Sequence, residues 1–154
     1  MYFADDDNTY TVKLFEEMRH TKRVSVWPVG IVGGLMVEKP KVEWNKHENS
    51  KVVTGWDVAW GPKRPFAIDM AGFAVNVQLF LDRPKAKFAY NVRGGYQESE
   101  FLGHLNIDLK DLEPKAEMCS KVYVWHTRAE KPSLKMEKER QSLLLPPSNM
   151  GMEV

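Results

Sequence analysis

Two segments of the chain show the periodicity of helices. Residues 9–20 place Tyr10, Leu14 and Met18 at spacings of four, which predicts a short amphipathic helix. The second segment follows a Gly-Gly pair in RGGYQESEFLGHL, where the pair predicts a turn and the residues after it a helix. This helix is expected to bury three apolar side chains: Phe101, Leu102 and Leu105.

Alternation of apolar and polar positions predicts strands at residues 23–29, 51–60 and 121–128. An extended segment ends at Glu38. Residues 39–51 are polar and mixed in charge, and they predict a surface loop or the end of a hairpin. Short strands mixed with short helices indicate an α/β or α+β domain.

The hydrophobic pattern at the two ends of the chain bears on its domain organisation. Residues 1–4 are apolar and predict a core strand, so we expect the chain to be the second part of a longer protein. The segment from Pro132 is charged and then apolar, and is expected to be loose or docked on a neighbour. The predicted division is a catalytic portion at 1–132 and a tail at 133–154.

Composition narrows the function classes. The chain has 154 residues, of which 43% are hydrophobic, so it can form a packed core. The formal net charge is +1, which gives no electrostatic reason to expect a nucleic-acid partner. Cys119 is the only cysteine, which excludes an internal disulfide and a multi-cysteine zinc site.

Three consecutive aspartates, Asp5, Asp6 and Asp7, repel one another and need an explanation. One interpretation places them at the positive end of a helix that begins near Thr9, where carboxylates cap free N–H groups. The other holds them together with a divalent cation. The triad alone leaves both interpretations open.

Isolated polar residues supply further candidate chemistry. Asp69 lies inside the most apolar stretch, where it is either satisfied by backbone N–H groups or functional. Glu98 is either a first-turn acid or a catalytic one. Trp60 and Arg64 flank a Gly-Pro turn, and a tryptophan there is either core or a platform for a sugar ring.

His126 and Arg128 project from one face of the predicted strand at 121–128. They are either a strand end that reaches solvent or a phosphate clamp. With an acidic cluster for a metal, this inventory suits group transfer from a nucleoside diphosphate to a hydroxyl. The sequence has neither a nucleophile elbow nor a P-loop motif.

Several blocks, in this order, make the sequence similar to the animal β-1,3-glucuronosyltransferases. The blocks are YFADDDNTY, VSVWPVG, RPFAIDMAGFAV, GGYQES, DLEPKA and VWHTR. The resemblance implies a GT-A fold, manganese as cofactor and UDP-glucuronic acid as donor. It implies inverting transfer to the 3-hydroxyl of a terminal galactose, by a homodimer in the Golgi membrane.

The resemblance also implies roles for single residues. Asp7 would be the direct metal ligand, with Asp5 and Asp6 on the ribose side, and Glu98 the catalytic base. His126 and Arg128 would contact the diphosphate. The acceptor contacts would be four residues: Glu38, Trp60, Arg64 and Asp69.

The acceptor is expected to be the proteoglycan linkage region, with N-acetyllactosamine of glycoproteins as the alternative. A non-catalytic carbohydrate-binding fragment is a further alternative, because the family's nucleotide-binding half precedes the acidic motif and the given sequence lacks it. We therefore expect the chain to be inactive alone. Two positions depart from the family pattern: Met118 replaces the Asn of a glycosylation sequon, and Met136 replaces an amide side chain.

Overall fold

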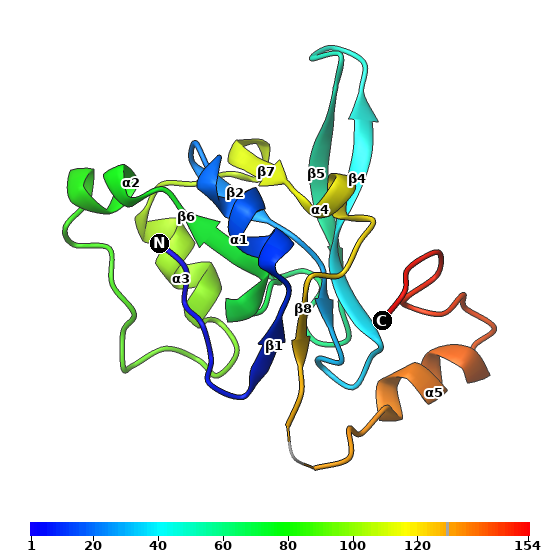
Figure 1. The fold of residues 1–154 in the computed structure, drawn as a ribbon. Coiled ribbons are helices and arrows are strands. Elements are labelled where there is room, and N and C mark those ends of the chain that lie inside the picture. The colour runs from blue at the N-terminus through cyan, green and yellow to red at the C-terminus, as the bar shows by residue number, and fades with distance from the viewer. Residues whose placement is uncertain (129) are drawn as a thin grey trace.

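The computed structural model describes residues 1–128 and 130–154. They form a five-stranded sheet in the order β1-β8-β3-β4-β5 and a three-stranded sheet in the order β6-β2-β7 (Figure 1). The strands are β1 (Asn8–Tyr10), β2 (Val24–Val26), β3 (Val29–Gly30), β4 (Val37–Asn45), β5 (Ser50–Asp57), β6 (Phe73–Val75), β7 (Leu112–Pro114) and β8 (Val124–His126). The helices are α1 (Val12–Arg19), α2 (Val77–Asp82), α3 (Gln97–His104), α4 (Ala116–Cys119) and α5 (Lys135–Ser142), with 3-10 turns at Met70–Gly72 and Leu109–Asp111. The predicted mixed α/β class is confirmed.

Strand β8 brings two parts of the predicted site together, the acidic turn before β1 and the pair His126 and Arg128. It pairs antiparallel with β1 and parallel with β3, and its register sets His126 opposite Asn8. The acidic turn directly precedes Asn8. The sheet therefore brings Asp7 to the end of β8, near Arg128, across more than a hundred residues of sequence.

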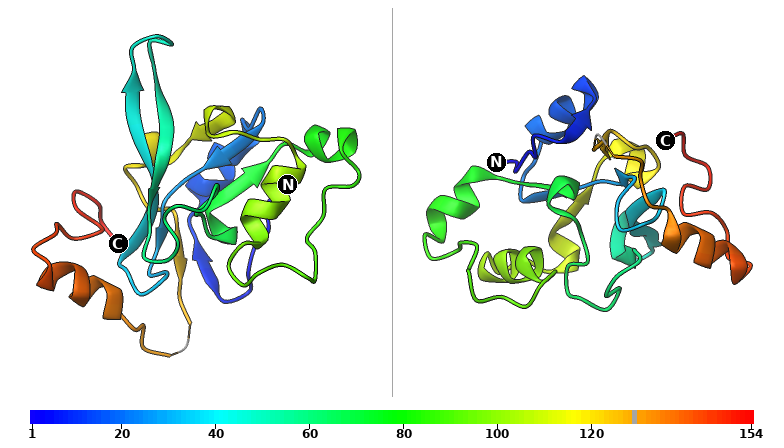
Figure 2. Two further views of the ribbon diagram at one scale, coloured as in Figure 1. Left: turned by 180° about the vertical axis from the view of Figure 1, so that it is seen from behind. Right: turned by 90° about the horizontal axis from the view of Figure 1, so that it is seen from below.

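Two apolar clusters cover the central strands on opposite sides. Helix α3 packs Phe101 and Leu102 against β2 and β6, and the rings of Phe101 and Phe88 stack with centroids 4.5 Å apart. Helix α1 contributes Leu14 to the second cluster, around Trp27. Figure 2 shows α1 and α3 on either side of these strands. Truncating Phe101 to Ala would cost about 3–5 kcal/mol, because its side chain is fully buried.

The predicted helix at 9–20 begins later than expected. Residues Asn8–Tyr10 form β1, and α1 starts at Val12 with Thr11 as its N-cap. The first turn of α1 contains no acidic residue. The interpretation of the aspartates as a cap for this helix is therefore wrong, because pairing with β8 keeps the chain extended up to Tyr10. The predicted strand at 1–4 is also wrong, since only Tyr2 forms an isolated bridge.

The polar segment 39–51 is mostly strand. It forms the outer half of β4, the turn and the start of β5, in a hairpin that projects from the body of the protein (Figure 1). Most residues of the hairpin tip are exposed, including the apolar Trp44, so the alternation of Val42 and Trp44 with polar residues does not mark a buried face there. The alternative prediction of a hairpin end covers only the four residues between the strands.

The tail is not loose in this structure, and its docking on a neighbouring molecule stays a prediction. It forms α5 and binds its own chain, with Glu137 and Ser148 buried. Within the described residues, no helix is both long enough and apolar enough to cross a membrane.

A left-handed turn leads into β8. Four consecutive residues, Ala116 to Cys119, have φ between 52° and 59°. L-residues other than Asn and Asp rarely adopt this conformation, and each costs roughly 1–2 kcal/mol in it. Met118 is among them and half exposed. The turn ends at Cys119, and β8 begins at Val124.

Candidate functional site

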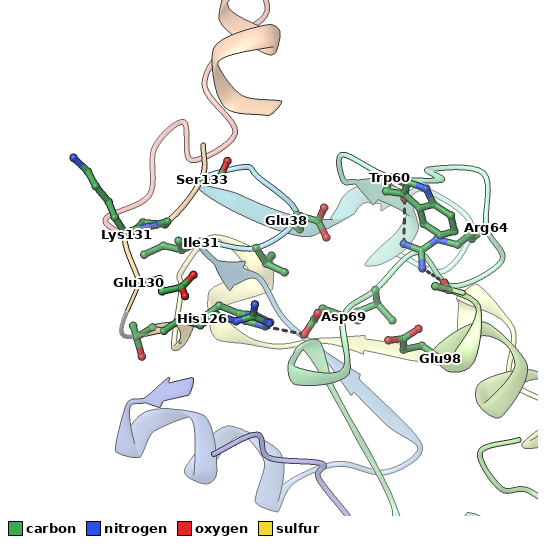
Figure 3. A pocket seen from close by; sticks show the side chains of 17 residues that line it. Ile31, Glu38, Trp60, Arg64, Asp69, Glu98, His126, Glu130, Lys131 and Ser133 are labelled. Atoms are coloured by element: carbon green, nitrogen blue, oxygen red, sulfur yellow. Dashed lines mark hydrogen bonds and ion pairs between the residues drawn. The ribbon is translucent and has the colours of Figure 1, made fainter. Parts of the chain in front are cut away.

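The site is an open cavity of about 730 Å³ between the loop after β3, the segment after β5, the start of α3 and the end of β8. Of the residues singled out from the sequence, seven line it: Glu38, Trp60, Arg64, Asp69, Glu98, His126 and Arg128 (Figure 3). Their convergence from separate elements is what the site prediction required. Asp5, Asp6 and Asp7 are not among the described residues that line it.

Glu38 is held at the start of β4. Its carboxylate accepts a hydrogen bond from the Ala59 N–H at 3.0 Å. It also lies against Gly33, where a side-chain Cβ would come within 2.2 Å of its oxygen. Burial raises the pKa of Glu38, although the Ala59 hydrogen bond opposes this. A carboxylate with one free oxygen in such a place can orient a hydroxyl.

Asp69 combines both of its predicted interpretations. Its side chain caps the 3-10 turn by accepting from the Ala71 N–H at 2.9 Å, which explains how an acid sits in an apolar stretch. The same oxygen lies 3.1 Å from Nε2 of His126 (Figure 3). This hydrogen bond is the main reason that the pKa of His126 is raised, and it favours the imidazolium form.

Glu98 lies in the first turn of α3, where the Gly-Gly turn delivers it to the cavity wall. Its Oε2 is buried and has no hydrogen-bond partner among the described residues. Burial raises the pKa of Glu98, and the negative charge of Asp69 raises it further. A carboxylate with a raised pKa in the wall of a cavity can accept a proton.

Trp60 and Arg64 form one unit. The Arg64 guanidinium lies over the Trp60 ring, 4.6 Å from its centroid. It donates to the carbonyl oxygens of Trp60 and Gly95 (Figure 3). Arg64 thus ties the loop after β5 to the turn before Glu98. Most of its donors are used inside the protein, so its positioning role is visible here, whereas its predicted contact with the acceptor stays a prediction.

The acidic turn is exposed, and its backbone accepts hydrogen bonds from the Tyr10 hydroxyl at 2.8 Å and the Thr127 N–H at 3.3 Å. Asp7 pairs with Arg128 at 3.2 Å, and Asp5 accepts from the Asn8 side chain at 3.3 Å. No group of three or more metal-binding side chains converges within the described residues. The triad therefore fits a hard cation only if other oxygens, such as those of a diphosphate and water, complete the coordination.

The sequence did not single out several residues of the cavity wall. They come from the loop after β3 and from the segment after β8: Ile31, Val32, Gly33, Glu130, Lys131 and Ser133. The Gly33-Gly34 pair was a signal for a turn, and Gly33 has φ of 62°. Nothing in the sequence showed that this turn would face Glu38, because that contact depends on how β3 and β4 pair.

Comparison with protein families gives one match over most of the chain. The model described as glycosyltransferase family 43 matches residues 1–130. This range includes every residue assigned to the site from the sequence, and the described lining residues beyond it are Lys131, Pro132 and Ser133.

Curated relatives are similar over the same part. Galactosylgalactosylxylosylprotein 3-beta-glucuronosyltransferase 3 of Homo sapiens is 55% identical over 141 residues, which is 92% of this chain and 40% of the relative. The type 1 enzyme of Rattus norvegicus is 58% identical over 135 residues, 87% of this chain and 39% of the relative. The sqv-8 protein of Caenorhabditis elegans is 54% identical over 137 residues, which is 89% of this chain and 37% of the relative. The chain thus spans about 40% of the length of these relatives.

Proposed function

The chain belongs to glycosyltransferase family 43, and we propose on that premise that it forms the acceptor and catalytic side of a β-1,3-glucuronosyltransferase. The names of its relatives support this reading, and so does the cavity, whose described lining includes four carboxylates, the ring of Trp60 and four basic side chains. The proposed fold is GT-A, and the proposed donor is UDP-glucuronic acid. The proposed acceptor is a terminal galactose of the proteoglycan linkage region.

Glu98 is the general base of the proposed reaction. It takes the proton of the galactose 3-hydroxyl while that oxygen attacks the anomeric carbon of glucuronic acid. The bond from that carbon to the diphosphate breaks, and UDP leaves from the opposite face, which inverts the configuration. A positioned base typically contributes about 10²–10⁴ in rate.

His126 and Arg128 hold the diphosphate. The pairing of His126 with Asp69 favours its protonated form, so it can neutralise negative charge on the leaving group. Arg128 pairs with Asp7 through a largely exposed contact, and a phosphate can replace that partner at little cost. A bound manganese ion would add positive charge at the diphosphate, held by Asp7 and by oxygens of the donor itself.

Acceptor binding uses the opposite wall. Trp60 offers an aromatic face, while Glu38 and Asp69 present carboxylate oxygens to sugar hydroxyls. These groups fix the acceptor so that one hydroxyl lies near Glu98. The free oxygen of Glu98, buried beside this wall, is the observation that carries the proposal.

The test is a transfer assay on the full-length protein with UDP-glucuronic acid and manganese. Galactosyl-galactosyl-xyloside and N-acetyllactosamine are offered as parallel acceptors. Glu98→Gln should lower kcat by roughly 10²-fold or more while UDP affinity stays close to that of the wild type. Glu100→Gln is the matched control, because Glu100 lies in the same first turn of α3 and is exposed.

Near-normal kcat in Glu98→Gln would overturn the assignment of the base. Preference for N-acetyllactosamine would replace the proposed acceptor by the alternative one. Binding of either acceptor without any transfer by the wild type would support a non-catalytic carbohydrate-binding protein.

A further inference from the structure

The tail contains a buried carboxylate that the proposed reaction does not use. Glu137, in α5, is 4% exposed. Its oxygens accept hydrogen bonds from the Met36 N–H at 3.1 Å, the Ser148 N–H at 3.1 Å and the Ser148 hydroxyl at 2.5 Å. Burial alone would raise the pKa of Glu137, but these hydrogen bonds lower it below the usual range. Such a buried charge is stable only with its partners in place.

One partner of the Glu137 carboxylate, the Met36 N–H, belongs to the loop 31–36, which we call the glycine loop; the other two donors are the N–H and hydroxyl of Ser148 in the tail itself. The Glu137 N–H donates to the Gly34 carbonyl at 2.9 Å. Ser148 extends the contact, because its hydroxyl oxygen accepts from the Val37 N–H at 3.0 Å. A Cβ on Gly34 would lie 3.0 Å from Met136, so α5 packs directly on the loop backbone. The tail therefore restrains several consecutive backbone groups of the loop.

The other side of the glycine loop faces the cavity. Ile31, Val32 and Gly33 line it. Gly33 lies against the carboxylate of Glu38, where even one added carbon would clash. The loop closes on itself through the Ile31 N–H and the Met36 carbonyl at 2.7 Å. A shift of the loop would consequently move Gly33 and change the space that confines the Glu38 carboxylate.

A second attachment reaches the other segment that holds Glu38. Arg140, also in α5, makes a two-point ion pair with Asp57 at 2.9 and 3.3 Å. Asp57 is the last residue of β5 and lies two positions before Ala59, whose N–H binds Glu38. Both partners of this pair are mostly buried, so solvent screens it less than a surface pair. Helix α5 thus binds both segments that contact the Glu38 carboxylate, the glycine loop and the end of β5.

We propose that Glu137 is a positioning residue for the acceptor site, and that with Ser148 it fixes the glycine loop so that Glu38 is held ready for a sugar hydroxyl. The proposal rests on the proposed function in assigning Glu38 to the acceptor. It extends the functional unit beyond residue 130, where the family match ends. It also assigns a role to the tail that a division at residue 132 would leave out.

The test compares Glu137→Gln and Ser148→Ala with Glu139→Gln in the full-length protein. Glu139 lies in the same helix, is exposed, and carries the same charge. Amide hydrogen exchange is followed in peptides that contain Met36 and Val37, and in a separate peptide that contains Ala59. The first two variants should speed exchange in both regions by roughly tenfold or more, and Glu139→Gln in neither.

Kinetics supply the second measurement. Glu137→Gln and Ser148→Ala should raise the KM for the acceptor severalfold while the KM for UDP-glucuronic acid is unchanged. A general loss of folded protein would instead lower kcat with both KM values unchanged, and would overturn the proposal. Faster exchange at Met36 with unchanged exchange at Ala59 would overturn it too. If the wild type transfers no sugar, the proposed function fails, while the exchange at Ala59 still decides whether the tail positions Glu38.

Discussion

The two walls of the cavity are built differently. On the acceptor wall, each side chain is fixed by the backbone of another segment: Ala59 binds Glu38, and Arg64 binds Gly95 beside Trp60. On the wall at the end of β8, Arg128 is largely exposed and held by its ion pair with Asp7. His126 lies between the two and bonds to Asp69.

The difference corresponds to the chemistry proposed for each wall. A neutral sugar gains little from long-range charge, so its site has to be shaped in advance by fixed donors and acceptors. A diphosphate with its cation brings strong charges of its own and can exchange one weak, exposed ion pair for stronger ones. We therefore expect substitutions on the acceptor wall to affect the fold, and substitutions in the acidic turn to affect ligand binding alone.

The largest effect is expected from Asp7→Asn. A hard cation needs an anionic oxygen, so this variant should abolish manganese-dependent UDP binding and transfer in the full-length protein. Its melting temperature should stay close to that of the wild type, because an exposed ion pair with Arg128 contributes about 0–1 kcal/mol. Calorimetry with UDP, with and without manganese, measures the first effect.

The control for Asp7→Asn is Asp6→Asn, in the same turn. Its effect should be smaller, because Asp6 is assigned to the surroundings of the metal and not to direct ligation. If the Asp7→Asn protein still bound UDP in a manganese-dependent way, Asp7 would not be the metal ligand.

Gly95→Ala should damage the acceptor wall through the fold itself. Gly95 has φ of 78°, and a Cβ there would lie 2.5 Å from the Trp60 ring. We expect a loss of about 1–3 kcal/mol in the free energy of unfolding, from backbone strain and displacement of the ring. Gly94→Ala is the matched control, since nothing lies within 4 Å of its added carbon. Equal unfolding midpoints for the two variants would contradict a prebuilt wall.

Glu98→Gln should raise stability while it removes activity. The raised pKa means that the folded state favours the protonated form of Glu98, so the ionised form destabilises the fold at neutral pH. Stability from protonation is fully present below the usual glutamate pKa and is lost as pH rises through the raised value. The variant should therefore melt above the wild type at pH 7, and the gap should close as the pH falls toward the usual value.

Thermal melts between about pH 4, close to the usual glutamate pKa, and about pH 8, above neutrality, test this sign. Glu100→Gln should show no such gap, because its carboxylate is exposed. A variant that melts below the wild type at pH 7, with the difference disappearing as the pH falls, would mean that Glu98 is stabilised as an anion, and would argue against its role as a base.

How much the sequence could predict depends on whether a feature is local. The helix after the Gly-Gly turn and its buried face, Phe101 and Leu102, follow from spacing alone, and the structure confirms them. The position of Asp7 beside Arg128 depends on the pairing of β1 with β8, which no local pattern encodes. The contact of Gly33 with Glu38 and the docking of Glu137 are of the same kind.

Local pattern also failed where solvent surrounds a regular element. The outer half of the projecting hairpin is mostly exposed and rich in charged residues, so it resembles a loop in sequence although its backbone is paired. Helix α5 is likewise polar nearly all round, and a buried glutamate, not an apolar stripe, attaches it. The residue pattern singled out most of the candidate residues, whereas resemblance to a family added Glu38 and the expected role of each residue, because it carries information about long-range contacts that periodicity lacks.

The smallest effect is expected at Met118, in the left-handed turn that leads into β8. Its φ is 59°, and Asn adopts this conformation more readily than Met because its short polar side chain can bond locally. Met118→Asn should add about 0.5–1 kcal/mol to the free energy of unfolding and leave transfer unchanged. The variant creates an Asn-Cys-Ser sequon, so it is compared in a host that does not N-glycosylate. Met150→Asn, at an exposed methionine outside the left-handed region, is the control and should not stabilise. Equal unfolding midpoints for the two variants would contradict a left-handed conformation at Met118.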